Sequence, residues 1–315
     1  MHESGRILVE YMRRMIRILL LICIVCSFSG CGDKGKEADS TASEEGKTLW
    51  TLTQYGDTTG LQASFYTIVS DEGQVVVVDG GHEENAPYVE KVLAESGNHV
   101  DVWILTHPHP DHIGAFLRVM EDGEVTVDAI YDNGVDPKVY TALAQEWDEP
   151  KIYERYMELT EGWSEVKSAK KGDEVSLPGL SIRFFWSYEP GMEQTIGDIH
   201  NNSSLVFQVK TQERSMLFVG DCHQDLVAER LLEENAEGLS SDYVQMGHHG
   251  NNTLPYSFYE KVSPKGVFFD APEWLLTGEQ YDAKTNYEQM KQLADEIYDY
   301  RTTPNKVCLY ETDGR

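Results

Sequence analysis

A cluster of potential metal ligands constrains this chain more than any other feature. The segment Thr106-His107-Pro108-His109-Pro110-Asp111-His112 follows an apolar, strand-like run at 102–105. Side chains two residues apart in extended backbone share a face, so His107 and His109 can face one ion, while Asp111 and His112 reach a second point after the Pro110 turn. Imidazole and carboxylate suit Zn²⁺ and also Mn²⁺ or Fe²⁺. The cluster therefore predicts a strand-end loop with two metal positions.

The rest of the body alternates strand-like and helix-like patterns, which is typical of a layered α/β domain. Runs rich in β-branched and aromatic residues predict strands at 64–70, 74–79, 102–106, 180–186, 204–210, 215–220 and 266–269. Apolar residues at helical spacing predict helices at 87–95, 224–233 and 286–300. The segment 140–162 also has a helical pattern between strand-rich stretches, so we expect an insertion near the mouth of the site.

The chain ends with a strand-like run followed by Asp313-Gly314, a dipeptide typical of a hairpin turn. No second strand follows this turn. We therefore expect either that the sequence is a fragment or that its last strand is unpaired.

The first residues have the pattern of a bacterial targeting segment. Arg13, Arg14 and Arg17 precede an apolar run at 18–28, which is too short to span a bilayer comfortably, and small residues follow it. Phe28-Ser29-Gly30-Cys31 resembles a lipoprotein lipobox, with Phe28 in place of the usual leucine. The resemblance implies a signal peptide at 1–31, cleavage before Cys31 and lipidation of its thiol. The alternative is an uncleaved anchor, and both place the body outside the cytoplasmic membrane of a bacterial cell.

Residues 32–48 are predicted to be a flexible acidic linker, because polar and small residues dominate and no large apolar residue occurs at 32–47. Residues 49–315 are then one domain. Its two cysteines, Cys222 and Cys308, allow either a disulfide in an oxidising compartment or two unpaired thiols.

Composition and charge limit the partners of this domain. The chain is 40% apolar and 25% charged, as expected for a globular protein with a core. Its 54 Asp and Glu outnumber 26 Lys and Arg, which gives a formal net charge of −28. Proteins bind nucleic acid largely by neutralising phosphates with Lys and Arg, so extended nucleic acid is not expected as a partner. A small-molecule or cell-envelope substrate is compatible with this charge.

Three further motifs accompany the histidine cluster in sequence order. Asp79 ends a run of four valines, Asp221 follows an apolar run, and His248-His249-Gly250 follows a third run at 243–246. Every defined position of the motif His-x-His-x-Asp-His is filled, by His107, His109, Asp111 and His112. With these motifs the chain resembles the metallo-β-lactamase fold superfamily. The resemblance implies a four-layer αββα sandwich and a metal-dependent hydrolase.

The resemblance also implies roles for the distant residues. Asp79 would orient a ligand histidine, and Asp221 would bridge two divalent metal ions, with zinc favoured over manganese or iron. Of the histidine pair, His248 is assigned as a ligand and His249 as a substrate-facing or supporting group, although the two could be exchanged.

The family's third metal-binding histidine allows two interpretations. His200 lies at the right offset before a serine that opens a strand. However, the run from Asn201 to Val206, together with His-His-Gly, is similar to a branch that lacks this histidine, found at the C-terminus of the DNA-uptake channel protein and in phosphorylcholine esterases. Without His200 the first metal would have two imidazoles, Asp221 and water, leaving more room for substrate.

These roles predict a hydrolase that works through a hydroxide bridging two ions. His107, His109, His200 and Asp221 would hold the first ion, and Asp111, His112, Asp221 and His248 the second. Asp111 would also orient the attacking water. A phosphodiesterase is favoured by the branch resemblance, the external tether and the open first site. The alternatives are an extracellular nuclease, a carboxylic ester, lactone or β-lactam hydrolase, and, outside enzymes, a lipid-anchored binding protein that keeps the metal site.

Overall fold

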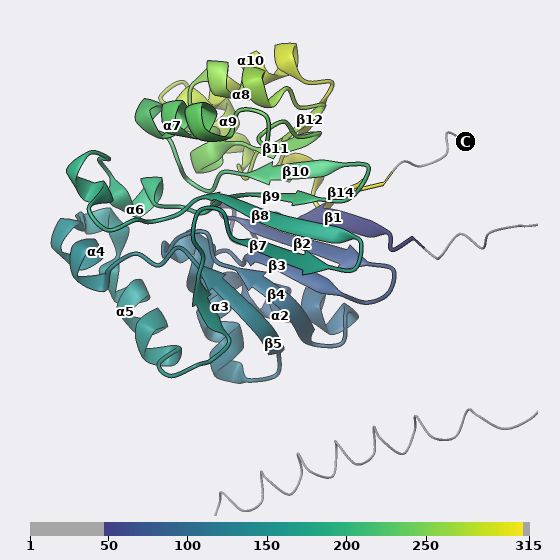
Figure 1. Ribbon diagram of the computed structural model, residues 1–315, viewed down its shortest axis with the longest axis vertical. Helices are drawn as coiled ribbons and strands as arrows, with labels where there is room; N and C mark the ends of the chain where they lie inside the picture. The colour runs from purple at the N-terminus through teal and green to yellow at the C-terminus, as the bar shows by residue number, and fades with distance from the viewer. Residues whose placement is uncertain (1–46, 311–315) are drawn as a thin grey trace, which may run out of the picture. The chain divides into compact units, whose positions relative to one another are not determined.

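The computed structural model of this protein describes residues 47–310 (Figure 1). The predicted signal segment, Cys31, residues 32–46 of the predicted linker and the Asp313-Gly314 turn lie outside the described residues. Within 47–310, no helix has the length and apolar character needed to cross a bilayer.

Two seven-stranded sheets face each other, and helices cover their outer faces (Figure 1). The first sheet has the order β14-β1-β2-β3-β4-β5-β6, with β14 Asn305–Cys308, β1 Trp50–Gln54, β2 Phe65–Ser70, β3 Val75–Asp79, β4 His99–Ile104, β5 Thr126–Asp132 and β6 Val166–Ser168. The second has the order β13-β12-β11-β10-β9-β8-β7, with β13 Glu296–Tyr298, β12 Gly266–Phe268, β11 Tyr243–Gln245, β10 Ser215–Phe218, β9 Val206–Lys210, β8 Leu180–Trp186 and β7 Glu174–Leu177. The predicted four-layer αββα sandwich is confirmed.

The helices lie between the strands along the chain. They are α2 Ala86–Glu95, α3 Pro110–Asp122, α4 Pro137–Leu143, α5 Pro150–Leu159, α6 Ile199–Asn202, α7 Asp225–Asn235, α8 Tyr256–Val262, α9 Glu273–Thr277 and α10 Asp282–Leu293. Short 3₁₀ turns lie between them, at η1 Glu83–Asn85, η2 Glu146–Asp148, η3 Met192–Gln194, η4 Gly247–Gly250 and η5 Tyr300–Thr302.

The valine run of β3 shows why the sheets are buried on both faces. Val76 and Val78 belong to the core between the two sheets, whereas Val75 and Val77 belong to the core under the outer helices. A strand covered on both faces needs apolar residues at successive positions rather than alternate ones. Aromatic rings fill the space between the sheets, where Phe207 and Phe218 stack at 4.9 Å. This packing fixes the position of β3, whose last residue is Asp79.

Most predicted elements are found within a few residues of their expected bounds. The helix expected at 286–300 is wrong in its last part, because α10 begins at Asp282 and ends at Leu293, and Ile297 lies in β13. Ile297 pairs with Val267 of β12, so strand pairing overrides the helical spacing of the local sequence. The strand expected at 102–106 starts earlier, at His99, and stops before Thr106.

The segment expected to be a helical insertion consists of α4, η2 and α5. Prolines at the first helical positions start α4 and α5, and Asp136 caps α4 by accepting the Lys138 amide at 2.8 Å. At the other end of the chain, β14 pairs with β1, so this strand is not unpaired. Cys222 and Cys308 are both free thiols.

Candidate metal centre

Strand ends carry the predicted ligands to one edge of the sandwich. β4 leads into the loop with His107 and His109, β10 leads to Asp221, and β11 leads to η4 with His249. β10 and β11 are parallel neighbours, so both of their carboxyl ends lie at this edge. The structure thus brings residues from distant parts of the chain together.

The turn before Asp221 depends on Gly220. Its φ is 53°, and a Cβ there would lie only 2.6 Å from the Ser204 Cβ. The Ser204 hydroxyl accepts the Asp221 amide at 3.1 Å. A larger residue at position 220 would therefore displace the Asp221 backbone.

The Asp221 carboxylate lies at the middle of the cluster. Its Oδ1 is 3.3 Å from His112 Nε2, and its Oδ2 is 3.3 Å from His249 Nε2 and 3.8 Å from His107 Nε2. Asp111 Oδ2 lies 3.2 Å from His249 Nε2. Two groups of potential ligands result, and they share His112. One consists of His107, His112 and Asp221, the other of Asp111, His112 and His249, and within each group the ligand atoms lie within 4.8 Å of one another.

His109 lies beside these groups, in the same loop as His107. Its Nδ1 lies 3.1 Å from His107 Nε2. The two imidazoles therefore present one nitrogen each to a shared space, as their spacing in the sequence predicts.

The other nitrogen of each histidine meets a protein oxygen. These pairs are His107 Nδ1 with Thr106 Oγ1 at 3.2 Å, His109 Nε2 with Asp148 Oδ1 at 3.3 Å, His112 Nδ1 with Asp79 Oδ2 at 2.8 Å, and His249 Nδ1 with the Asp270 carbonyl at 3.0 Å. An outer partner of this kind fixes the ring orientation and leaves the inner nitrogen to bind. Asp79 also accepts the Thr106 amide and hydroxyl, so it anchors the start of the loop.

The structure places His249, rather than His248, beside the two carboxylates. Both have left-handed backbone, with φ of 49° for His248 and 57° for His249. The His248 ring instead stacks against His223 at 5.3 Å. Of the two interpretations that the sequence left open, the geometry supports the one in which His249 is the ligand and His248 is not.

His200 faces away from Asp221. Its Nε2 donates to the Tyr140 carbonyl at 2.8 Å, and its Nδ1 lies 3.3 Å from Asp148 Oδ2. It belongs to a separate group with Asp148 and Asp198. The geometry therefore supports the interpretation without a third histidine ligand.

The buried charges perturb one another strongly. Burial alone would lower the pKa of His112, but the Asp221 and Asp79 carboxylates raise it well above its ordinary value. Against the same effect of burial, Asp221 and Asp111 raise the pKa of His249 to about 10. Burial and the nearby His112 charge hold the pKa of His107 well below its ordinary value. A cation bound here would replace protons on His112 and His249, so its affinity would rise with pH.

The cluster fits a divalent cation. His112 Nε2, His249 Nε2 and Asp221 Oδ1 are buried and form no hydrogen bond with any described residue, although oppositely charged atoms lie within 3.3 Å. Leaving such groups unsatisfied costs about 1–3 kcal/mol each. Imidazole nitrogens and carboxylate oxygens are ligands that Zn²⁺ and related ions use. A cation among these atoms would satisfy all three.

Comparison with known proteins agrees with this geometry. Residues 58–226, more than half of the chain, match the family model of the metallo-beta-lactamase superfamily. The chain belongs to this superfamily. No curated protein matches the chain.

Solved structures show a similar fold at low sequence identity. The metallo-beta-lactamase fold protein YhfI from Bacillus subtilis is 15% identical with a TM-score of 0.50, covering 83% of this chain and 100% of its own. CmlA, a diiron beta-hydroxylase from Streptomyces venezuelae, is 14% identical with a TM-score of 0.49, and the match covers 83% of this chain and 54% of CmlA. Igni18, a metallo hydrolase from Ignicoccus hospitalis, is 14% identical with a TM-score of 0.46, covering 84% of this chain and 100% of Igni18.

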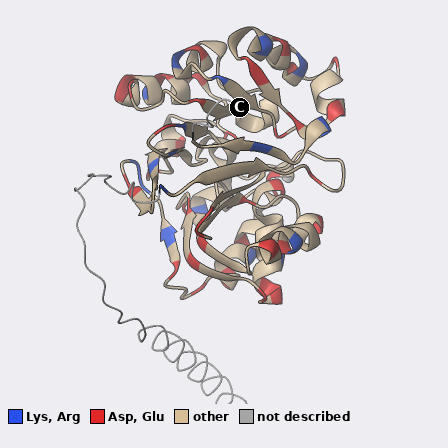
Figure 2. Ribbon diagram, turned by 90° about the vertical axis from the view of Figure 1, so that its right-hand side faces the viewer, with Lys and Arg blue, Asp and Glu red and all other residues tan. Residues whose placement is uncertain are grey.

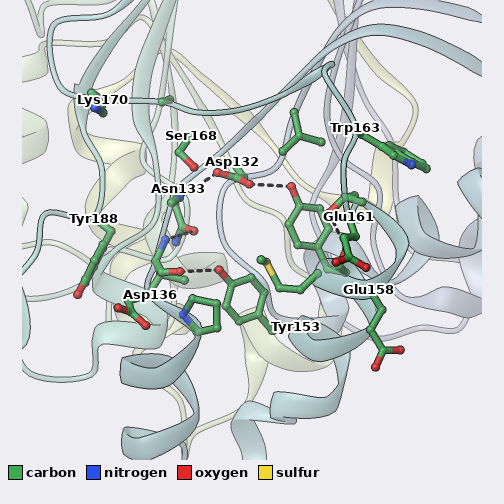
Figure 3. Close-up of a pocket in the computed structure, with 18 of the residues that line it drawn as sticks. Asp132, Asn133, Asp136, Tyr153, Glu158, Glu161, Trp163, Ser168, Lys170 and Tyr188 are labelled. Carbon is green, nitrogen blue, oxygen red and sulfur yellow. Dashed lines mark hydrogen bonds between the residues drawn. The ribbon is translucent and has the colours of Figure 1, made fainter.

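An open cavity of about 1020 Å³ is lined by residues from the end of β5, from α5 and from the segment around β6 (Figure 3). Tyr153, Trp163 and Tyr188 line it together with several carboxylates, and Asp132 accepts the Tyr156 hydroxyl at 2.7 Å. His107 does not line this cavity. Solvent reaches the centre past His109 and Asp111, whose side chains are 10% and 14% exposed, whereas His107 and His112 are fully covered.

Two supporting residues of this centre were missed in the sequence. Asp148 lies in η2, and its only sequence signal is its position three residues after Gln145, which is the spacing of a helix cap. Asp270 follows β12, and its buried carboxylate accepts amide hydrogens from Gln54 at 2.8 Å and Gln245 at 2.7 Å. Nothing local in the sequence indicates that either residue faces a histidine.

Proposed function

We propose that this protein is a dinuclear, zinc-dependent phosphodiesterase that acts on a small molecule. The observation that carries the proposal is the position of the Asp221 carboxylate, which lies within 3.8 Å of the imidazoles of His107, His112 and His249. Three side chains meet in each of two donor groups, His107 with His112 and Asp221, and Asp111 with His112 and His249. Catalytic zinc sites use three protein ligands and keep a further position open for water or substrate.

The shared carboxylate favours hydrolysis of a phosphodiester. When bound, a pair of divalent cations supplies a nucleophile from water at neutral pH and neutralises charge on the attacking and leaving oxygens of an in-line displacement. The acidic surface favours a small substrate over a long polyanion, since Asp and Glu are spread over both helical layers (Figure 2).

The chain's own residues divide the remaining work. Asp221 lies within ion-pair distance of His107, His112 and His249, and Asp79 keeps His112 turned toward Asp221. Asp111, paired with His249 and partly exposed, is placed to orient a water molecule and accept its proton. Its pKa is lowered by His112 and His249 although burial opposes this, so it is ionised near neutral pH.

A panel of substrates tests this assignment. The zinc-loaded full chain is expected to hydrolyse bis-p-nitrophenyl phosphate and to leave nitrocefin and p-nitrophenyl butyrate unchanged, with single-stranded DNA cut slowly or not at all. Release of nitrophenolate and of DNA fragments gives the readout, and Asp111→Asn is the inactive control. Turnover of nitrocefin or the ester without the phosphodiester would replace the proposal by the carboxylic alternative. Bound metal with no turnover of any substrate would favour a binding protein.

We further propose that Cys31 anchors the protein to the outer side of a bacterial cytoplasmic membrane. The basic residues, apolar run and lipobox-like tetrapeptide ending at Cys31 support this localisation. In a bacterial host, Cys31→Ser is expected to abolish incorporation of labelled fatty acid into the protein. The variant should also be lost from the membrane fraction that detergent solubilises. Cys308→Ser is the matched control, because Cys308 is a free thiol in β14. Equal labelling of both variants would exclude the anchor.

A further inference from the structure

We infer that Asp148, supplied by the segment between α4 and α5, is a positioning residue that holds His109 in its metal-binding orientation. The inference rests on the proposed metal centre, but it does not depend on which substrate is hydrolysed. It gives the inserted segment a function in metal binding that its helical pattern alone does not indicate.

The two nitrogens of His109 face opposite partners. Nδ1 lies 3.1 Å from His107 Nε2, on the side of Asp221. Nε2 lies at an ion-pair distance of 3.3 Å from Asp148 Oδ1, and neither of these two buried atoms forms a hydrogen bond with a described residue. The backbone of His109 is fixed as the N-cap residue of α3. The ring can still rotate about its side-chain bonds, so an outer carboxylate is needed to hold it.

The segment fixes Asp148 before any ion arrives. Asp148 is 1% exposed, and its Oδ2 accepts the Gln145 amide at 2.6 Å. The Tyr140 hydroxyl, which is fully buried, lies 3.2 Å from the Asp148 carbonyl and 3.4 Å from the Pro108 carbonyl. Tyr140 therefore ties η2 to the loop that carries His109.

His200 completes the support from the opposite side. Its Nε2 donates to the Tyr140 carbonyl at 2.8 Å, and its Nδ1 faces Asp148 Oδ2 at 3.3 Å. The rings of His200 and His109 lie parallel at 6.4 Å, with the Asp148 carboxylate in contact with both. The histidine whose spacing suggests a third ligand thus acts on the centre through Asp148.

The contacts favour positioning over direct ligation by Asp148. Asp148 shares a donor group with Asp198 and His200, and neither group that contains His112 includes it. Its Oδ1 lies beside the outer nitrogen of His109, Nε2, rather than beside the inner one.

Competition titration of Zn²⁺ against a chromophoric chelator tests the inference without any substrate. The wild-type chain is expected to bind two ions. Asp148→Ala is expected to weaken one of them by about 10–100-fold and to leave the other unchanged. Asp148→Asn, which keeps an acceptor oxygen, should bind this ion with an affinity between those of wild type and Asp148→Ala. Glu154→Gln, an exposed charge on α5, is the matched control and should bind as wild type.

Two further measurements separate positioning from a general structural effect. The metal-free variants should melt within a few degrees of wild type, and His200→Gln should weaken the same ion less than Asp148→Ala does. The double variant should bind no more weakly than Asp148→Ala, because His200 acts through Asp148. Wild-type affinity at both sites in Asp148→Ala, or a zinc-loaded crystal structure with an Asp148 oxygen bonded to the ion at about 2.0–2.2 Å, would overturn the inference. Neither outcome would contradict the proposed phosphodiesterase activity. Conversely, failure to hydrolyse any phosphodiester would not contradict the positioning role of Asp148.

Discussion

Replacement of Asp221 by alanine is expected to abolish phosphodiester hydrolysis while the fold survives. Within residues 47–310, the Asp221 carboxylate is the one group within ion-pair distance of His107, His112 and His249 together. Its loss would remove the donor that the two proposed metal positions share. Metal ions contribute several kcal/mol to stabilising charge in such reactions, and each 1.36 kcal/mol is a factor of ten in rate, so kcat/KM should fall by about 10³-fold or more.

Metal content gives the Asp221 prediction a second readout. The Asp221→Ala and Asp221→Asn variants should each lose at least one equivalent of bound metal, measured by elemental analysis, and should keep the circular dichroism spectrum of wild type. Glu229→Ala removes an exposed carboxylate from α7 and should retain full activity and metal content. Substantial hydrolysis by either Asp221 variant would refute the assignment of this residue as a bridge.

Removal of the metal is expected to destabilise the protein as well as to inactivate it. A ligand that binds only the folded state adds about 4 kcal/mol of stability when its free concentration is 1,000 times its Kd. For a domain of this size, 1 kcal/mol corresponds to about 2–4 °C in Tm. Chelation should therefore lower Tm by about 8–16 °C, because His112, His249 and Asp221 are left buried without the cation that satisfies them.

Calorimetric melting with and without a chelator measures this shift. Readdition of Zn²⁺ should restore both Tm and activity, and Mn²⁺ should do so if the centre tolerates either ion. The Asp221→Ala variant serves as the control, because its Tm should respond much less to metal. An unchanged Tm for wild type after complete removal of metal would contradict the proposed centre.

The metal loop was predictable because its information is local. His107 and His109 share a face in any extended backbone, and Asp111 and His112 follow a proline that starts a helix. Asp79 and Asp221 could also be found, since each follows a strand that is apolar at successive positions. Their order along the chain matched a known family.

Other features of the centre depend on contacts that no local pattern encodes. The choice between His248 and His249 follows from two successive left-handed residues in η4. The role of His200 follows from the Tyr140 carbonyl, which lies 60 residues earlier in the sequence. Asp148 reaches His109 because Tyr140 ties η2 to the loop, and Ile297 is a strand residue because it pairs with β12.

The sequence by itself determined which strand ends carry the candidate metal ligands and that the sheets are buried on both faces, because residue type and short-range periodicity are sufficient for both. The tertiary structure alone decided which nitrogen of each histidine points inward. That orientation is set by the oxygen that meets the outer nitrogen, such as Asp148 for His109, Asp79 for His112 and Asp270 for His249. These oxygens come from distant segments that only the packed sandwich brings into contact.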